Sequence, residues 1–225
     1  MFSPEWIFET ILLLVPLMFS LTVHEFAHAR TALAFGDPTA QAMGRVSLNP
    51  LVHLDPLGTI VLIVTRGFGW AKPVPVNPNN LYPRRLGNIM VSLAGPASNL
   101  CLAIVAVVSM KVLMAILPAG QGTTWQGPVF EMLFWLMIAN IALCTFNLVP
   151  LFPLDGHHIV RELLPPAKQA DFMHWQIHYG RYILAGVILI PVVLNINGPV
   201  GWVIMRVASL AIRVFDLGQI WSYLP

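Results

Sequence analysis

Two histidines and a glutamate near the N-terminus have the residue types and spacing of a metal-dependent hydrolytic site. His24 and His28 are four residues apart, so on a helix both imidazoles lie on one face and can ligate one zinc ion. Glu25 directly follows His24 and is placed to take a proton from a water that such an ion activates. The three residues lie in a run that is apolar enough to enter a membrane, where ionisable groups are costly and mark functional sites.

A catalytic zinc ion also needs a third protein ligand and an open position for water. We expect this ligand to be Asp155, which follows a broken helix. The apolar run before it ends in Asn147-Leu-Val-Pro150-Leu-Phe-Pro153-Leu-Asp155-Gly156. Two prolines three residues apart cannot continue a helix, so the chain becomes extended just before the carboxylate. An Asp-Gly pair on its own is normally a simple turn. The asparagine and the two prolines before it favour the interpretation of Asp155 as a metal ligand.

The composition is that of a membrane protein along nearly the whole chain. Of its 225 residues, 57% are hydrophobic and only 10% are charged, and the mean hydropathy is +0.74. Soluble domains carry about 25% charged residues. The net charge of +2 is too small to indicate a nucleic-acid partner. Acidic Glu5 and Glu9 stand where a cleavable signal peptide would be basic, so we do not expect one.

Apolar runs predict an all-α polytopic membrane protein with about five transmembrane helices. The runs cover about residues 6–35, 86–117, 129–149, 182–196 and 200–214. The histidines lie in the C-terminal half of the first run. Cys101 and Cys144 lie in apolar runs as well, where a free cysteine behaves as a small hydrophobic residue.

The connection between the first two runs, residues 36–84, predicts a re-entrant or interfacial β element. Its apolar piece, 57–64, is too short to cross a bilayer as a helix. Gly67 and Gly69 permit a tight turn between two extended arms, and two prolines that follow exclude helix and indicate an edge strand. Such backbone is tolerated at membrane depth only where it lines a protein cavity.

The distribution of lysine and arginine predicts the orientation in the membrane. Basic residues gather between the first and second runs and between the third and fourth, whereas the 118–127 and 195–199 loops contain none. By the positive-inside rule, the N-terminus is outside and the C-terminus is cytoplasmic. The histidine pair and Asp155 both fall toward the cytoplasmic side, which supports one shared site. Lys111 and Arg206 depart from the pattern.

The chain resembles the site-2 protease family of intramembrane zinc metalloproteases in four sequence features. They are His24-Glu25-x-x-His28, Asn147-x-x-Pro150-x-x-Pro153-Leu154-Asp155-Gly156, Gly67-Phe68-Gly69-Trp70 and Ala94-Gly95-Pro96-x-x-Asn99. The resemblance implies that His24, His28 and Asp155 hold one Zn²⁺ per chain. It implies that Glu25 is the general base and that Asn147 binds substrate or the oxyanion.

The family also implies an activity and an organisation. The activity is hydrolysis of peptide bonds in or beside transmembrane segments of substrate proteins, as in regulated intramembrane proteolysis. We predict a single integral membrane protease domain over residues 1–225, with its core at 6–160 and additional C-terminal helices at 180–215. No loop is long enough for the PDZ domain that many bacterial members insert, so this resembles a minimal bacterial or archaeal member in cell-membrane lipid.

The glycine-rich segment is also a candidate substrate-binding element. A substrate helix must unwind to expose its carbonyl, and the edge near Trp70 to Val76 can hold the unwound strand by strand addition. Gly67 and Gly69 would form the turn before this edge. Alternatively, the segment only closes the inner mouth of the helix bundle.

Five further histidines leave other interpretations open. His53 is a candidate for stabilising an oxyanion, or it orders a loop. His157 or His158 is a candidate for support behind the ligands. His174 and His178 are also four residues apart, but in a polar segment this spacing favours a solvated helix face.

Two other classes of membrane protein compete with the protease. A membrane di-iron hydroxylase or desaturase would use three histidine pairs, but it would leave Glu25 and the segment from Asn147 to Asp155 without a role. A divalent-metal transporter would need polar residues through to the outer side. Here the outer halves of the runs are almost uniformly apolar.

Overall fold

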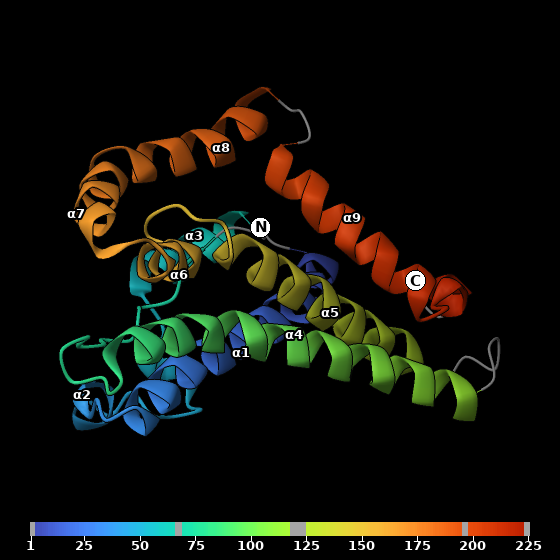
Figure 1. Cartoon of the computed structure of the whole chain (residues 1–225). Helices are drawn as coiled ribbons and strands as arrows, with labels where there is room; N and C mark the ends of the chain where they lie inside the picture. The colour runs from blue at the N-terminus through green and yellow to red at the C-terminus, as the bar shows by residue number, and fades with distance from the viewer. Residues whose placement is uncertain (1–2, 66–68, 118–124, 195–197, 223–225) are drawn as a thin grey trace.

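The computed structural model describes residues 3–65, 69–117, 125–194 and 198–222. Three long helices, α1, α4 and α5, lie side by side and form the body of the molecule (Figure 1). They cover Pro4–Ala34, Arg84–Ile116 and Gln126–Asn147. At about 1.5 Å per residue, each can span a hydrocarbon layer of about 30 Å, and each is apolar enough to cross it.

This bundle exposes apolar side chains and buries polar ones, as expected in lipid. One face of α1 leaves large apolar side chains about half exposed: Ile7, Phe8, Ile11, Val15 and Phe19. The helix interfaces bury polar residues that bond to one another: Ser20, His24, Asn99 and Asn140. Because lipid offers polar groups no partner, buried ones must pair inside the bundle. The chain is therefore a multi-pass membrane protein.

The connection between α1 and α4 contains helices where the sequence predicted a re-entrant β element. It has α2 (Thr39–Ala42), η1 (Pro50–Val52) and α3 (Pro56–Thr65). In the described part of the chain, the β pairing is a single antiparallel bridge between Leu54 and Ala71. The β prediction was therefore wrong for the described residues. Gly67, expected to form its turn, lies outside them.

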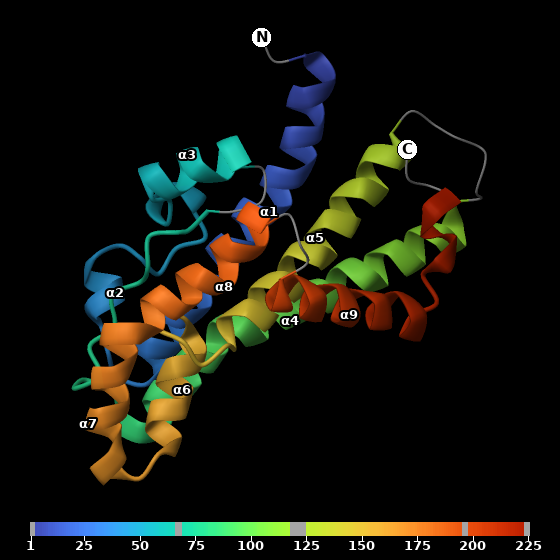
Figure 2. The same cartoon turned by 90° about the horizontal axis from the view of Figure 1, so that it is seen from above.

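A helix cap explains why the apolar run after Asp55 is helical. The Asp55 side chain accepts a hydrogen bond from Gly58 N at 2.8 Å, and its carbonyl oxygen accepts one from Thr59 Oγ1 at 2.7 Å. Pro56 occupies the first helical position, where its missing N–H costs no helical hydrogen bond. The resulting helix has 10 residues and lies to one side of α1 (Figure 2).

After α5, the chain returns along the bundle through shorter helices. These are α6 (Asp155–Leu163), α7 (Pro166–Trp175), η2 (Gln176–Gly180), α8 (Arg181–Leu194), α9 (Pro199–Val214) and η3 (Gly218–Ser222). The helices α8 and α9 have 14 and 16 residues, fewer than the roughly 20 that a spanning helix needs. Of the about five predicted transmembrane helices, the described structure contains three.

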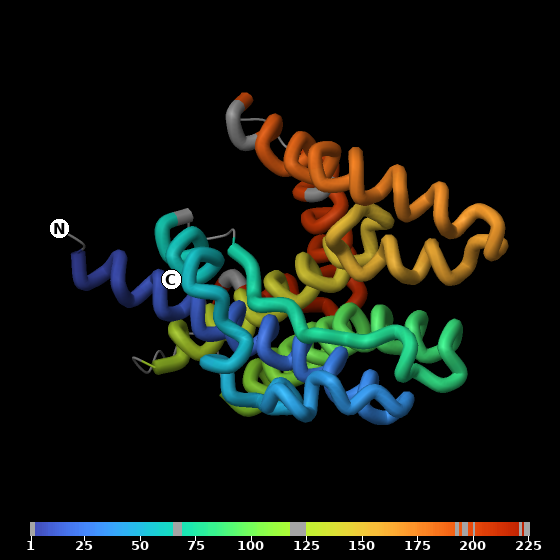
Figure 3. The backbone as a smooth tube through the Cα atoms, turned by 90° about the vertical axis from the view of Figure 1, so that its left-hand side faces the viewer, coloured from blue at the N-terminus to red at the C-terminus, as the bar shows by residue number. Residues whose placement is uncertain are grey.

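The two ends of the bundle carry different elements. Figure 3 shows α7 (orange) and α2 (light blue) at one end and the N-terminus at the opposite end. After α9, the buried Leu217 and Ile220 belong to the same core cluster as Met110 of α4 and Phe130 of α5. The end of the described chain therefore packs on the part of α4 and α5 that lies farthest from α7.

Candidate metal centre

Two histidines of α1 and an aspartate at the start of α6 converge inside the protein. His24 Nε2 lies 3.4 Å from Asp155 Oδ2, and His28 Nε2 lies 3.3 Å from Asp155 Oδ1. The two Nε2 atoms are 3.0 Å apart. One ligand atom from each residue lies within 4.8 Å of the others. The structure thus brings together the three residues predicted as ligands, in a group that can hold one metal ion.

Helix periodicity and a broken helix position these side chains. One helical turn separates the two histidines, so they share a face of α1. The helix α5 ends at Asn147, and a proline-containing loop turns the chain back so that α6 begins with Asp155. A Cβ on Gly156 would lie 2.4 Å from the Leu148 carbonyl oxygen and 2.5 Å from that of Val149. Only glycine therefore lets α6 approach the end of α5 closely enough.

Hydrogen bonds on the far side of each ring set which nitrogen faces the group. His28 Nδ1 lies 2.7 Å from the Val91 carbonyl oxygen, and His24 Nδ1 lies 2.7 Å from Asn99 Oδ1. An oxygen of this kind can only accept, so each Nδ1 carries the proton and donates it. Each Nε2 then directs a lone pair toward the group, as metal-binding histidines do.

This arrangement fits a divalent cation. Two nitrogen lone pairs and a carboxylate face one another, which is repulsive unless positive charge lies between them. Asp155 Oδ2 is buried and accepts no hydrogen bond. Two imidazoles and one carboxylate with an open position form a donor set typical of catalytic zinc.

The helix α4 supplies site residues to which the sequence prediction gave no role. Besides Val91 and Asn99, Gly95 lies against the ligands: a Cβ there would be 2.4 Å from His28 Nε2 and 2.5 Å from His24 Cε1. Gly95 and Asn99 are four residues apart, so they share one helix face. The four-residue spacing of Gly95 and Asn99 is the sequence signal that both belong to the site. The family resemblance includes this motif but assigns no role to either residue.

Glu25, predicted as the general base, accepts a hydrogen bond from a distant backbone group. Its Oε2 lies 2.8 Å from Val74 N. Val74 belongs to an extended stretch between the Leu54–Ala71 bridge and Asn77, which we name the 71–77 segment. The structure therefore brings the predicted base into direct contact with the segment that was predicted to hold substrate.

The 71–77 segment is fixed at its start by the loop that precedes α3. Lys72 N donates a hydrogen bond to the His53 carbonyl oxygen at 2.8 Å. Arg45 Nη2 donates one to the Lys72 carbonyl oxygen at 2.6 Å. Arg45 is buried, and this hydrogen bond ties its guanidinium group to the start of the segment.

At its end, the segment is fixed by the fully buried carboxylate of Asp37. Asp37 accepts hydrogen bonds from Asn77 N at 2.7 Å and from Asn80 Nδ2 at 2.8 Å. Thr39 donates two more, from its N–H and its hydroxyl. Burial raises the pKa of Asp37, but the four hydrogen bonds outweigh burial and leave the pKa below its ordinary value. The segment is thus held at both ends, with Val74 over Glu25 between them.

His53 and Asn147 make contacts close to their own positions in the chain. His53 Nε2 donates to the Ser47 carbonyl oxygen at 2.8 Å, and its Nδ1 faces Arg45 Nη2 at 3.4 Å. Both ring nitrogens of His53 therefore have their partners in the loop that precedes it. Asn147, the last residue of α5, donates from Nδ2 to the Leu143 carbonyl oxygen at 3.0 Å.

Gly69, which belongs to the described part of the glycine-rich segment, packs on α3. A Cβ on Gly69 would lie 2.5 Å from Leu62 Cβ and 2.7 Å from the Gly58 carbonyl oxygen. Glycine at this position therefore allows a close approach between the segment and α3. The adjacent Trp70 is 41% exposed.

The remaining histidines do not assemble a second metal group in the described part of the chain, where His24, His28 and Asp155 form the single group of three. His157 is buried against Phe152 and His158. Burial lowers the pKa of His158 to about 4, so it is neutral near pH 7. The pair His174 and His178 is exposed. A di-iron centre built from three histidine pairs therefore has no counterpart in these residues.

Comparison with known proteins gives a family model and several relatives. The model of Peptidase family M50 matches residues 107–187. The "Putative zinc metalloprotease YwhC" of Bacillus subtilis is 43% identical over 158 residues, covering 70% of this chain and 71% of the relative. The "Putative zinc metalloprotease Rip2" of Mycolicibacterium smegmatis is 35% identical over 175 residues, covering 72% of this chain and 64% of the relative. No solved structure matches the chain.

Proposed function

Because the chain belongs to peptidase family M50, the site-2 protease family of zinc metalloproteases, we propose that it cleaves peptide bonds in or beside transmembrane segments of other proteins. The observation that carries this proposal is the convergence of His24, His28 and Asp155 on α1 and α6, in a bundle whose long helices can span a membrane. A hydrolytic site in such a bundle has direct access to membrane-embedded peptide bonds.

The proposed mechanism assigns one task to each residue of the group. His24, His28 and Asp155 hold one zinc ion per chain, which when bound polarises the scissile carbonyl and lowers the pKa of a water. Glu25 takes a proton from the attacking water and passes it to the leaving amine. Asn147 is assigned to substrate or oxyanion binding, since it ends the helix that precedes the Asp155 loop.

The 71–77 segment is our candidate for binding an unwound substrate strand. In an extended chain, alternate residues direct their backbone groups to opposite edges. Lys72 and Val74 direct their N–H groups into the protein. The other edge belongs to Pro73 and Pro75, which have carbonyl oxygens but no N–H. We therefore propose that substrate donates its own N–H groups to these two carbonyls.

Residues near this edge receive smaller roles in the proposal. Trp70 is a candidate for apolar contact with substrate because it is exposed at the start of the segment. Gly69 holds that start close to α3. We omit the oxyanion role predicted for His53, since both of its ring nitrogens already have partners in its own loop.

We expect Val74→Pro to lower turnover on the order of tenfold or more while zinc content stays unchanged. Proline fits extended backbone but removes the N–H that Glu25 accepts. Because Glu25 acts on every substrate, turnover should fall equally for a transmembrane helix and for a helix-destabilised peptide. The measurement is kcat for both substrates, with metal content determined on the same preparations.

Ala71→Pro is the matched variant, since it alters the start of the same segment and leaves Val74 N–H in place. We expect it to slow cleavage of the helical substrate and to spare the helix-destabilised one. If Val74→Pro cleaves both substrates at the wild-type rate, the segment does not act through Glu25.

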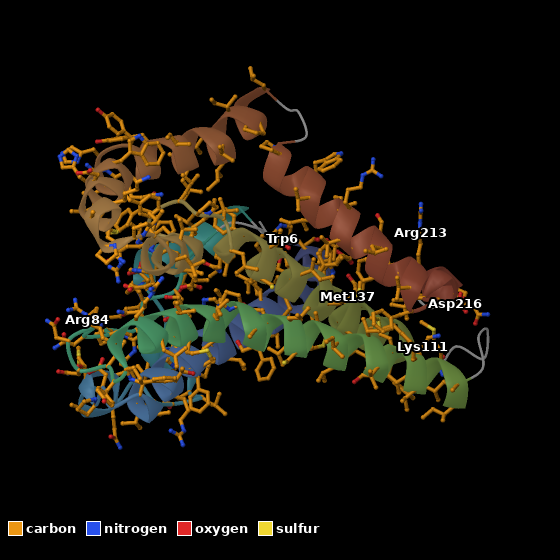
Figure 4. The ribbon with its side chains drawn as sticks, in the orientation of Figure 1. Trp6, Arg84, Lys111, Met137, Arg213 and Asp216 are labelled. Atoms are coloured by element: carbon orange, nitrogen blue, oxygen red, sulfur yellow. The ribbon has the colours of Figure 1, made fainter. Side chains whose placement is uncertain are left out.

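We propose that the N-terminus lies outside and that the metal group faces the cytoplasm, as the lysine and arginine distribution predicts. Arg84 lies at the α7 end of the bundle, and Lys111 and Asp216 lie at the other (Figure 4). The packing near Leu217 supports a different proposal for the last crossing. Because this region joins the core at the end opposite α7, we propose that α8 and α9 cross together once. The C-terminus is then outside, not cytoplasmic, and 1–225 form one membrane domain.

Cysteine labelling tests this orientation. In protein whose Cys101 and Cys144 are replaced by alanine, we expect a membrane-impermeant maleimide to label Gly122→Cys and Ser222→Cys in intact cells. Asn79→Cys should react only after the inner face is opened. Gly122 lies outside the described residues, whereas Asn79 and Ser222 are exposed. The reverse pattern would invert the protein, and a protected Ser222→Cys would restore five crossings.

The proteolytic function is tested by membrane proteomics of cells that express wild type or Glu25→Gln at equal levels. We expect fragments that end within or beside a transmembrane segment to accumulate only with wild type. Identical fragment sets in both strains, with zinc bound to both proteins, would contradict the proposal.

A further inference from the structure

We propose that Asn140 and Ser20 are positioning residues for the metal group, because they fix the orientation of the Asn99 amide and thereby the proton position on His24. This inference rests on the proposed zinc site. Asn140 reaches the site through Asn99, which is bonded to His24. Asn140 and Ser20 both lie in apolar runs of the sequence.

The four residues form a continuous chain of hydrogen bonds through three helices. His24 Nδ1 lies 2.7 Å from Asn99 Oδ1. Asn99 Nδ2 lies 2.8 Å from Asn140 Oδ1. Asn140 Nδ2 lies 2.7 Å from Ser20 Oγ. The Ser20 hydroxyl lies 2.7 Å from the Pro16 carbonyl oxygen. The chain starts on α1, passes through α4 and α5, and returns to α1.

The far end of this chain determines its direction. Asn140 Nδ2 also lies 2.8 Å from the Leu136 carbonyl oxygen, which can only accept. The NH₂ group of Asn140 must therefore face Leu136 and Ser20, and its Oδ1 must face Asn99. Asn99 therefore donates from its own NH₂ group to Asn140 Oδ1. Its Oδ1 is then directed at His24 Nδ1 and accepts the hydrogen bond from it. A reversed Asn99 amide would point N–H donors at the donating Nδ1 of His24 and would favour the wrong tautomer.

The two histidines are thus oriented by different means. The Val91 carbonyl oxygen fixes His28 directly, and a backbone carbonyl cannot rotate. The Asn99 amide can rotate by half a turn, so it needs a partner that distinguishes its oxygen from its nitrogen. Asn140 Oδ1, 2.8 Å from Asn99 Nδ2, supplies that distinction, and the Ser20 backbone carbonyl oxygen adds a longer contact to the same nitrogen at 3.4 Å.

Burial argues that these amides are present for a reason other than packing. Asn99, Asn140 and Ser20 are completely buried between the helices. Placing an amide in such surroundings is unfavourable unless every donor and acceptor is paired. An apolar residue of similar size would fill the same space without that requirement. The chain that begins at His24 gives both amides a function.

Zinc affinity of the full-length metal-free protein in detergent tests the inference. We expect Asn140→Leu to raise the Kd for Zn²⁺ about tenfold in competition with a chromophoric chelator, since partners behind a metal ligand typically contribute 10–100-fold. Asn99→Leu should raise the Kd at least as much. In the Asn99→Leu background, Asn140→Leu should have no further effect, because its action passes through Asn99.

The double variant separates positioning from packing. If Asn140→Leu only loosened the helix interface, its effect on the Kd would persist in the Asn99→Leu background, and that result would overturn the inference. An unchanged Kd for Asn140→Leu alone would overturn it as well. Wild-type protein that fails to bind Zn²⁺ would remove the proposed function and the inference together, whereas loss of the coupling alone removes only the inference.

Two hydroxyls of α1 provide a matched control. Ser20 and Thr22 both donate to the carbonyl oxygen four residues earlier, at 2.7 and 2.8 Å. Only Ser20 is bonded to Asn140. We expect Ser20→Ala to raise the Kd severalfold, less than Asn140→Leu because Leu136 still orients Asn140, and Thr22→Ala to leave it unchanged. Equal effects of the two alanines would contradict the proposed direction of the chain.

Discussion

Replacing Glu25 with glutamine is expected to lower turnover about 10³-fold while the protein still binds one zinc ion. Glutamine has the shape of glutamate, and its side-chain oxygen can still accept the hydrogen bond from Val74 N–H. It cannot take up a proton from water at neutral pH. His24, His28 and Asp155 are unaltered, so the metal group stays intact.

The measurement pairs cleavage of a transmembrane substrate by purified protein with metal analysis of the same sample. Asp155→Ala is the contrasting variant: it removes a ligand, so activity and zinc should disappear together. Retained cleavage by Glu25→Gln would exclude Glu25 as the general base. Loss of zinc from Glu25→Gln would mean that Glu25 contributes to metal binding, which the proposal does not include.

Gly95→Ala is expected to abolish zinc binding and proteolysis together. The added methyl group would lie 2.4 Å from His28 Nε2 and 2.5 Å from His24 Cε1, in the space where the ligands converge. Helix formation itself should not suffer, because alanine is favoured over glycine within a helix by about 1 kcal/mol. We therefore expect the metal-free variant to keep the helical circular-dichroism signal of metal-free wild type, while its zinc Kd rises at least 100-fold.

Gly186→Ala is the matched control for this variant. Gly186 also lies within a helix, and its added Cβ would make an ordinary contact, 3.7 Å from Ile190 Cδ1. It should bind zinc as wild type does. Full zinc content in Gly95→Ala would show that the two imidazoles do not converge next to α4.

The residues of the metal group could be predicted from sequence because each one is tied to a local rule. The spacing of His24 and His28 fixes a shared face once the run is helical. Asp155 could be placed because two prolines interrupt the preceding helix. The β element between residues 36 and 84 was predicted wrongly because the glycines and prolines of 67–77 were given more weight than the helix signals that precede them. The cap by Asp55 with Pro56 at the first helical position was the decisive local signal.

The polar chain behind His24 could not be predicted in the same way. Its hydrogen bonds join residues 75, 41 and 120 positions apart in the sequence. Each residue of this chain is a single polar residue in an apolar run. Which faces of two such runs meet depends on how the helices pack. The contact between Val74 and Glu25 spans 49 positions and depends on anchors at Lys72 and Asn77, which no local pattern specifies.

The two prolines of the 71–77 segment also bear on how copies of the protein meet in a crowded membrane. Exposed strand edges are sites of self-association, because one edge can pair with the same edge of a second molecule. Such pairing needs donors on at least one side. At Pro73 and Pro75 the edge has acceptors alone, so two copies that approach through this edge have no backbone hydrogen bond to form between these residues. A strand with free N–H groups can still bind at this edge. The segment can therefore pair with a substrate strand but not with the same two prolines of a second copy.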